Sequence, residues 1–204
     1  MSEKVVEMQS LIFTSQAASW ILNAAYVIWL APEFIYAFRY RVDAKFRTGD
    51  RLSNIGISIS IWIGIFLGYW LAHTEAWADT SWHPVILFAV GIASMMIGVA
   101  FRFYAISILG KYFSMRLAIQ PGQIVVQDGP YRWIRHPSYT GALITLFGVG
   151  LALGNWLSLI VILVAGFIGY SYRAMVEERT LLVALGDPYR EYMKHTKRFI
   201  PFVY

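Results

Sequence analysis

Five long apolar stretches constrain this chain more than any other feature of its sequence. They run over about Leu11–Phe38, Leu52–Ala72, Val85–Ile108, Ser138–Leu153 and Trp156–Tyr172. A helix rises about 1.5 Å per residue, so the first three can cross a hydrocarbon core of about 30 Å and the last two barely match it. With 58% hydrophobic and 14% charged residues, a soluble domain could not bury so much apolar surface. The sequence therefore predicts an all-α integral membrane protein with about five transmembrane helices.

The last two apolar stretches are joined by only Gly154 and Asn155. A glycine can take the left-handed conformation that ends a helix, which predicts a tight helix hairpin over residues 138–172. Glycines within the two stretches predict close approach of the two backbones: Gly141, Gly148, Gly150, Gly166 and Gly169. We divide the chain into three N-terminal transmembrane helices, residues 1–108, and a core of loop, hairpin and helical tail, residues 109–204.

The cations are distributed asymmetrically along the chain. Of 17 lysines and arginines, five lie in residues 39–51, five in 102–135 and six in 173–198, and only Lys4 lies elsewhere. A five-helix topology puts these three segments on one side, and basic loops face the cytoplasm. We therefore expect the N-terminus outside and a cytosolic pocket, in a cell inner membrane or an endomembrane. Topology explains the net charge of +5 better than nucleic-acid binding does, and no protein partner is predicted.

The densest run of polar, cationic and aromatic residues is GPYRWIRHPSYTG, residues 129–141. Pro137 lacks a backbone N–H but suits a first helical turn, so Arg135 and His136 are expected just before a helix. The free N–H groups and positive dipole end of such a turn favour an anionic group.

A second polar cluster follows the fifth apolar stretch. Arg173 and Glu177 are four residues apart and share a helix face on which they can pair, whereas Glu178 points away from that face. Both clusters are expected at one membrane surface, at the two ends of one hairpin, so we expect them to be neighbours. The chain has no cysteine and its histidines lack metal-ligand spacing, so no metal site is predicted.

Taken together, the two clusters resemble the isoprenylcysteine carboxyl methyltransferase family, whose core is shared with phospholipid N-methyltransferases. The resemblance covers about residues 109–201. The earlier stretches resemble the family only in being apolar segments long enough to span a membrane. It rests on Gly129-x-Tyr131-x-x-x-Arg135-His136-Pro137-Ser138-Tyr139-x-Gly141, on Arg173-x-x-x-Glu177-Glu178 and on Gly186-x-x-Tyr189-x-x-Tyr192. It implies a membrane methyltransferase that uses S-adenosylmethionine and a lipid-linked acceptor such as an isoprenylcysteine carboxylate.

The resemblance also implies a set of cofactor-binding residues, because no glycine-rich loop after a strand is present to bind a nucleotide. Val125, Val126 and Tyr131 are expected to form walls for adenine. Donors for the methionine carboxylate are expected from Arg135 and His136. Glu178, Tyr139 and Tyr189 are expected near the sulfonium and ammonium groups. Relatives often carry histidine where this chain has Gln123, so a contact there must come from an amide or the backbone.

The catalytic residues implied are Arg173 and Glu177. A carboxylate acceptor is ionised at neutral pH and needs orientation more than a base, so Arg173 would hold it and Glu177 would hold Arg173. An amine acceptor must lose a proton, and Glu177 would then be the general base. A nicotinamide-dependent sterol or isoprenoid reductase on a related membrane core and a non-enzymatic lipid-binding scaffold are also compatible with these features. Arg102 and Glu33, inside apolar stretches, are interpreted as a snorkelling residue and a kink residue.

Overall fold

The computed structural model describes residues 11–39, 51–74, 83–114 and 118–203. Helices account for most of these residues, and no β-strand occurs among them. In chain order the elements are α2 (Leu11–Thr14), α3 (Gln16–Arg39), α4 (Arg51–Thr74), α5 (Pro84–Leu109), the 3-10 helices η3 (Gly110–Tyr112) and η4 (Gly129–Arg132), α6 (Pro137–Ala152), α7 (Trp156–Leu185) and α8 (Asp187–His195).

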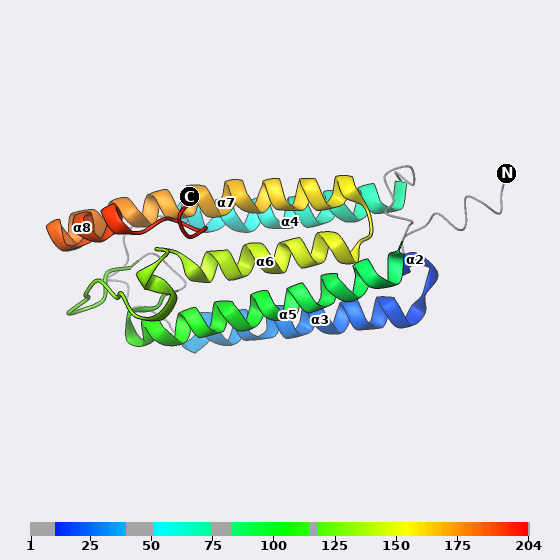
Figure 1. Cartoon of the computed structure of the whole chain (residues 1–204), viewed down its shortest axis with the longest axis horizontal. Coiled ribbons are helices and arrows are strands. Elements are labelled where there is room, and N and C mark those ends of the chain that lie inside the picture. Colours follow the sequence, from blue (N-terminus) through cyan, green and yellow to red (C-terminus); the bar gives the residue numbers. More distant parts are fainter. Residues whose placement is uncertain (1–10, 40–50, 75–82, 115–117, 204) are drawn as a thin grey trace.

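The predicted apolar helices are all present and run alternately up and down in one elongated bundle (Figure 1). Within the described residues, α3, α4, α5 and α7 are long and apolar enough to cross a membrane, and α6 is a shorter apolar helix. The first predicted stretch is divided, because α2 ends at Thr14 and α3 begins at Gln16, with Pro32 inside α3. The fold class predicted from the sequence is confirmed.

The predicted end of the fifth helix at Tyr172 is wrong, because α7 continues as one helix of 30 residues to Leu185. No glycine or proline interrupts residues 173–185, and Gly186 ends the helix with φ +63°. Consequently Arg173, Glu177 and Glu178 are carried by the spanning helix itself and not by a separate tail helix.

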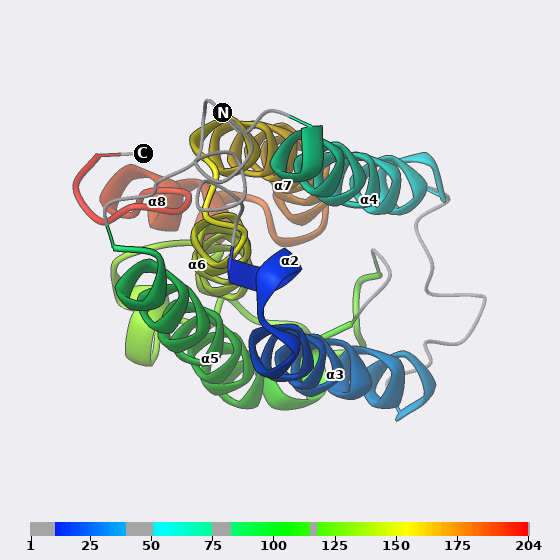
Figure 2. The same cartoon turned by 90° about the vertical axis from the view of Figure 1, so that its right-hand side faces the viewer.

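Helix α6 is the central helix of the bundle (Figure 2). Of its 16 residues 11 are buried. Its glycines face α5 more than α7: a Cβ at Gly141 would lie 2.7 Å from Arg102 N, and one at Gly148 would lie 2.5 Å from Gly91 O. Among the hairpin glycines, Gly150 and Gly166 serve the predicted contact between α6 and α7, where a Cβ would meet Leu159 and Leu146. The hairpin turn is as predicted, with Gly154 at φ +65°.

Helix α7 packs along α4, the second predicted stretch. Added Cβ atoms at Gly64 and Gly68 of α4 would lie 2.6 Å from Ala165 and Ile162 of α7. Serine hydroxyls reinforce the contact, because Ser158 Oγ donates to Gly68 O at 2.7 Å and Ser60 Oγ to Ala165 O at 2.6 Å. Small residues and serine hydrogen bonds are typical of helix contacts within membranes. Helices from residues 1–108 and helices from residues 109–204 therefore pack against one another in the bundle.

The segments that bear cations meet at one end of the bundle. Helices α3, α5 and α7 end there and α4 and α6 begin there, with α8 at the same end (Figure 1). Most of the basic loop after α3, the acidic loop at residues 75–82, Arg116 and Lys4 lie outside the described residues. The side of the membrane that this end faces stays a prediction.

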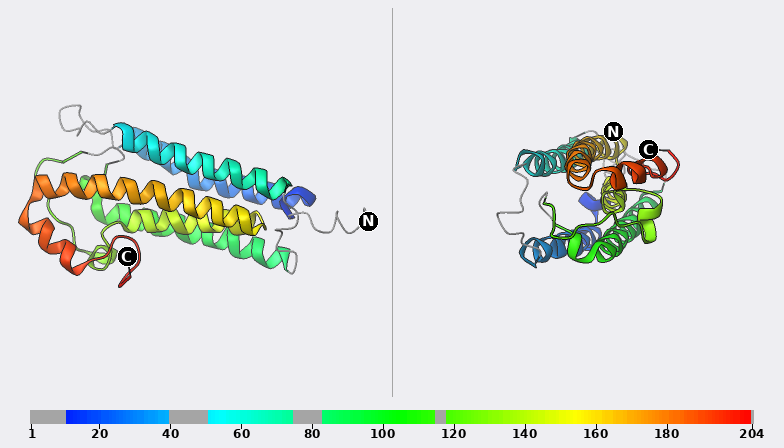
Figure 3. Two further views of the ribbon diagram at one scale, coloured as in Figure 1. Left: turned by 90° about the horizontal axis from the view of Figure 1, so that it is seen from above. Right: turned by 90° about the vertical axis from the view of Figure 1, so that its left-hand side faces the viewer.

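Two irregular segments at this end fold against each other. The loop from Gly110 to His136 runs to the start of α6, and the C-terminal residues after α8 fold back beside it (Figure 3). Ile134 and Lys197 form a parallel bridge. The backbone of Arg135 and His136 is thereby fixed before α6 begins.

Candidate functional site

A cavity of about 480 Å³ lies at the cation-bearing end of the bundle. This volume falls within the roughly 300–1,000 Å³ usual for small-molecule sites. Its polar wall comes from α5, α6, α7, α8 and the loop before α6, and its apolar wall comes from α3 and α4. The lining residues on which the following description depends are Trp29, Glu33, Ile61, Trp62, Arg102, Gln123, Val125, Val126, Tyr131, Arg135, His136, Ser138, Tyr139, Tyr170, Arg173, Glu177, Tyr189 and Tyr192.

The cavity extends deep into the apolar part of the bundle. Trp29 lies ten residues before the end of α3, and Ile61 lies ten residues after the start of α4, which corresponds to roughly 15 Å along each helix. Trp62 lines the cavity and is 54% exposed, and its neighbours Ile59, Ile63 and Phe66 on α4 are exposed as well. The cavity therefore reaches from a polar end to a part of α4 that carries exposed apolar side chains.

The structure brings ten of the eleven predicted site residues to this cavity, from four separate segments of the chain. The exception is Glu178, which does not line it. Its side chain is 4% exposed and contacts Arg135 Nε at 2.8 Å, Arg198 Nη2 at 2.9 Å and His136 Nε2 at 3.3 Å. Glu178 does point away from the face of Arg173 and Glu177, as predicted.

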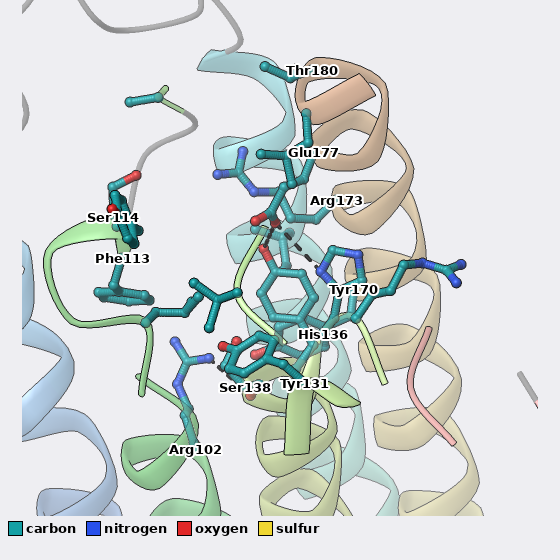
Figure 4. A pocket seen from close by; sticks show the side chains of 18 of the residues that line it. Arg102, Phe113, Ser114, Tyr131, His136, Ser138, Tyr170, Arg173, Glu177 and Thr180 are labelled. Atoms are coloured by element: carbon teal, nitrogen blue, oxygen red, sulfur yellow. Dashed lines mark hydrogen bonds and ion pairs between the residues drawn. The ribbon is translucent and has the colours of Figure 1, made fainter. Parts of the chain in front are cut away.

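His136 and Glu177 lie at one corner of the cavity (Figure 4), and Tyr139 lines the cavity beside them. His136 is the N-cap residue of α6, and its ring stacks on Tyr139 with centroids 5.2 Å apart and planes 3° apart. Tyr139 Oη donates to Glu177 Oε2 at 2.6 Å. His136 Nδ1 lies 3.8 Å from the same oxygen. The predicted juxtaposition of the two sequence clusters is thus confirmed.

Arg173 lies beside this corner and is held from another helix. It is 4% exposed, and its Nη1 donates to Ser53 Oγ of α4 at 2.6 Å. Ser53 itself is completely buried. A guanidinium held at a cavity wall suits recognition of a carboxylate, because its planar donor geometry matches the two carboxylate oxygens. Ser53 carries no motif, so sequence reasoning missed it.

A second charged pair lines the deeper part of the cavity, and sequence reasoning underrated it. Arg102 of α5 forms an ion pair with Glu33 of α3 through Nε, and its Nη2 donates to the other carboxylate oxygen at 3.0 Å. Its Nη1 donates to Ser138 O at 3.2 Å. Figure 4 shows Arg102 low in the view and Arg173 higher, below Glu177 and Thr180, with Tyr170 and His136 at heights between the two arginines.

The snorkelling interpretation of Arg102 is wrong, because this side chain is 8% exposed and points into the protein. The signal that could have identified the pair was its composition: ionisable residues inside membrane helices are costly and mark functional sites. Their separation of 69 residues hid the pairing.

Three tyrosines that line the cavity outside the spanning helices, Tyr131, Tyr189 and Tyr192, are neutral phenols. Burial raises the pKa of Tyr131, Tyr189 and Tyr192 above the ordinary value of 10.0. Tyr131 and Tyr192 are also tied into the fold, because Tyr192 Oη donates to Tyr131 O at 2.7 Å. These groups can donate hydrogen bonds or offer aromatic faces, but they are not bases near neutral pH.

The loop before α6 supplies the remaining predicted residues. Val125 and Val126 line the cavity as half-buried apolar side chains. The side-chain oxygen of Gln123 accepts a hydrogen bond from Gln120 N at 2.8 Å, closing the turn at Pro121–Gly122. Within the described residues no group of histidines and carboxylates could hold a metal ion.

These features define a class: a polytopic, all-helical membrane protein whose bundle encloses a cavity with a cationic end and an apolar end. Comparison with known proteins specifies the class further. Residues 89–183 match the model of the isoprenylcysteine carboxyl methyltransferase (ICMT) family. Over these residues the chain is similar to this family.

Individual relatives agree with the family match. Over 109 residues the chain is 31% identical to the protein-S-isoprenylcysteine O-methyltransferase of Schizosaccharomyces pombe, covering 47% of this chain and 46% of that protein. Over 196 residues it is 26% identical to a probable protein-S-isoprenylcysteine O-methyltransferase of Oryza sativa subsp. japonica, covering 93% of this chain and 98% of that protein. The chain thus spans about half the length of the first relative and nearly all of the second.

A solved structure supports the fold. The eukaryotic intramembrane Ras methyltransferase ICMT matches with a TM-score of 0.59 at 23% identity, over 92% of this chain and 66% of that one. This likeness concerns the arrangement of the helices.

Proposed function

We propose that this protein is an S-adenosylmethionine-dependent membrane methyltransferase that O-methylates the carboxylate of an isoprenylcysteine-like, lipid-linked acceptor. The observation that supports this most strongly is the cavity that joins a cationic end to an apolar wall next to exposed apolar side chains of α4. A substrate with a charged group and a long hydrocarbon chain matches both ends at once. The family and the names of the relatives support the same reaction.

The residues of the polar corner fit the methyl donor. Arg135 and His136 supply donors for its carboxylate, Glu177 and Tyr189 supply an anion and an aromatic face for its cationic groups, and Val125 with Val126 provides apolar surface for adenine. S-adenosylmethionine, when bound, supplies a methyl group carried on a positively charged sulfur. After methyl transfer, that sulfur is part of the leaving group as a neutral thioether.

The acceptor half of the site orients a carboxylate and excludes water. Arg173, fixed by Ser53, is the group that we assign to hold the acceptor carboxylate. The Arg102–Glu33 pair lies deeper, where Trp29 and Ile61 form the apolar wall for the hydrocarbon chain. Nucleophile and acceptor are the same carboxylate oxygen, so no residue of the chain has to remove a proton. We place the polar end on the cytosolic side.

Ligand binding and turnover test this proposal. Titration calorimetry on the detergent-solubilised protein should detect S-adenosylmethionine and no nicotinamide dinucleotide, and a farnesylated or geranylgeranylated cysteine derivative should be methylated on its carboxylate. His136→Ala should weaken donor binding by roughly 10- to 150-fold, the equivalent of one hydrogen bond to a charged group. Binding of the dinucleotide alone would replace this function with a reductase, and binding of neither would favour a lipid-binding scaffold.

An amine acceptor is the second candidate, favoured by the half-exposed position of Glu177 on the cavity wall. This carboxylate, bonded to Tyr139, could take a proton from an amine lipid. Methylation of amine lipids with no methylation of prenylcysteine would establish this reaction instead.

A further inference from the structure

We propose that Glu178 is a positioning residue, which fixes Arg135 and His136 at the cavity wall by locking the C-terminal segment to the start of α6. In this role it is not itself a ligand of the methyl donor. The identity of the ligand bound at this corner rests on the proposed function, whereas the positioning role does not.

The carboxylate of Glu178 is occupied on both oxygens. Arg135 Nε and His136 Nε2 contact Oε1 at 2.8 and 3.3 Å, and Arg198 donates through Nε and Nη2 to Oε2 at 3.0 and 2.9 Å. With a side chain 4% exposed and outside the cavity lining, it offers no face to a ligand. We call Glu178, Arg135, Arg198 and His136 the Glu178 cluster.

Backbone hydrogen bonds continue the cluster along the chain. Arg135 N donates to Lys197 O at 2.7 Å, and His136 N donates to Arg198 O at 3.0 Å. The guanidinium of Arg135 also donates to the carbonyl oxygen of Thr196, which is the C-cap residue of α8. Two successive residues at the cavity wall are therefore held by three successive residues of the C-terminal segment.

Phe199 completes this attachment on the side of α6. It is 1% exposed, and its ring lies against those of His136 and Tyr139, with centroids 6.1 and 6.4 Å away. Its carbonyl accepts a hydrogen bond from Thr140 Oγ1 at 2.8 Å. The C-terminal segment thus supports the stacked His136–Tyr139 pair from behind.

The consequence is that the orientation of His136 is set from outside the cavity. The Glu178 carboxylate beside Nε2 fixes the orientation of the ring, with Nδ1 toward Glu177. Carboxylates that orient a ligating histidine in this way typically change affinity or activity by about 10- to 100-fold when removed. Arg198 and Thr140 do not line the cavity, so any effect of changing them on ligand binding must be indirect.

The first test measures the accessibility of His136 and needs no ligand. Diethyl pyrocarbonate modification, mapped by mass spectrometry, should leave His136 protected in the wild type, with the exposed His195 as internal reference. Arg198→Ala should make His136 reactive. The matched control is Arg190→Ala, which removes an exposed arginine of α8 that pairs with the exposed Asp187. Arg198→Lys should restore part of the protection.

The second test measures donor binding by calorimetry and by steady-state kinetics. Arg198→Ala and Glu178→Gln should each raise the KM for S-adenosylmethionine about 10- to 100-fold, with kcat at saturating donor nearly unchanged. The double variant should be no worse than either single variant, because both remove the same attachment. Thr140→Val, a milder change of the same attachment, should shift KM in the same direction.

Two results would overturn the inference. One is a protected His136 and unchanged donor affinity in Arg198→Ala. The other is weakened binding in Glu178→Gln with His136 still protected, which would make Glu178 a ligand. If Arg198→Ala does not fold, Arg198→Lys and Thr140→Val carry the same comparison. If the wild type binds no S-adenosylmethionine, the proposed function fails, and the reactivity of His136 still decides the positioning role.

Discussion

At the residue scale, the arginines near the site differ in what their side chains bond. Arg135 and Arg198 bond the buried carboxylate of Glu178, whereas Arg173 lines the cavity and donates to the hydroxyl of Ser53. A guanidinium that lines a cavity and is oriented by a neutral hydroxyl can meet a carboxylate that the substrate brings. This position is the reason for assigning the acceptor carboxylate to Arg173.

Replacing Arg173 should therefore separate catalysis from architecture. Arg173→Ala should cut turnover by about 10²- to 10³-fold, which is the usual effect of removing one group that stabilises negative charge in an active site. The affinity for the methyl donor should stay nearly unchanged. Arg173→Lys should recover little, because an ammonium cannot reproduce the two-pronged grip of a guanidinium. Methylation of a prenylated cysteine derivative measures kcat, and calorimetry measures donor affinity.

The control for this series is Arg179→Ala, an exposed arginine on the same helix. It should leave turnover unchanged. Normal methylation by Arg173→Ala would remove this residue from the mechanism.

At the element scale, glycine contacts set how closely α5 and α6 approach and hence where Arg102 and His136 lie. An added Cβ at Gly98 would lie 2.5 Å from Thr145 N and 2.6 Å from Gly141 O, both in the backbone of α6. Backbone cannot move aside as the end of a flexible side chain can. The two helices would have to separate, and the cavity wall that they share would shift with them.

Gly98→Ala should accordingly destabilise the protein by about 1–3 kcal/mol, the usual cost of overpacking. At about 2–4 °C per kcal/mol for a chain of this size, the thermal midpoint in detergent should fall by several degrees. Gly56→Ala in α4 is the matched control, since its Cβ would meet nothing within 4 Å. That change should be neutral or stabilise by up to about 1 kcal/mol through helix propensity. Equal midpoints for the two variants would contradict the close-contact interpretation.

At the scale of the whole molecule, the bundle is asymmetric from end to end. All described loops that bear several cations, together with α8, lie at the end that holds the cavity. In the proposed function, the apolar wall would receive the hydrocarbon part of a lipid-linked substrate, and the polar end would receive the soluble methyl donor. The division into residues 1–108 and 109–204 does not separate the site, because α3 and α4 form one of its walls.

Reporter fusions test the orientation of this asymmetric bundle. Five spanning helices and the 16-to-1 distribution of cations predict the N-terminus outside and the C-terminus in the cytoplasm. Fusions of a periplasm- or lumen-active reporter and a cytosol-active reporter at each terminus should therefore give opposite results at the two ends. The same sidedness at both ends would require an even number of spans and would exclude the five-helix topology.

The amino-acid sequence alone determined the features that depend on local chemistry. The apolar stretches predicted the spanning helices, and Gly154 and Pro137 predicted a turn and a helix start. The two polar clusters, together with the family resemblance that they carry, predicted ten of the residues that line the cavity. These features are readable because length, backbone conformation and helix termini are set by residues adjacent in the chain.

Only the tertiary structure decided which side chains meet. The pairing of Glu33 with Arg102, the Ser53 contact of Arg173 and the Glu178 cluster all join residues far apart in the chain. The spanning helices are apolar on nearly every side, so their sequences carry little periodicity to show which face packs inward. In such helices, close contacts of glycine and serine fix the rotation of each helix, and that rotation decides which charges share the cavity and which lie outside it.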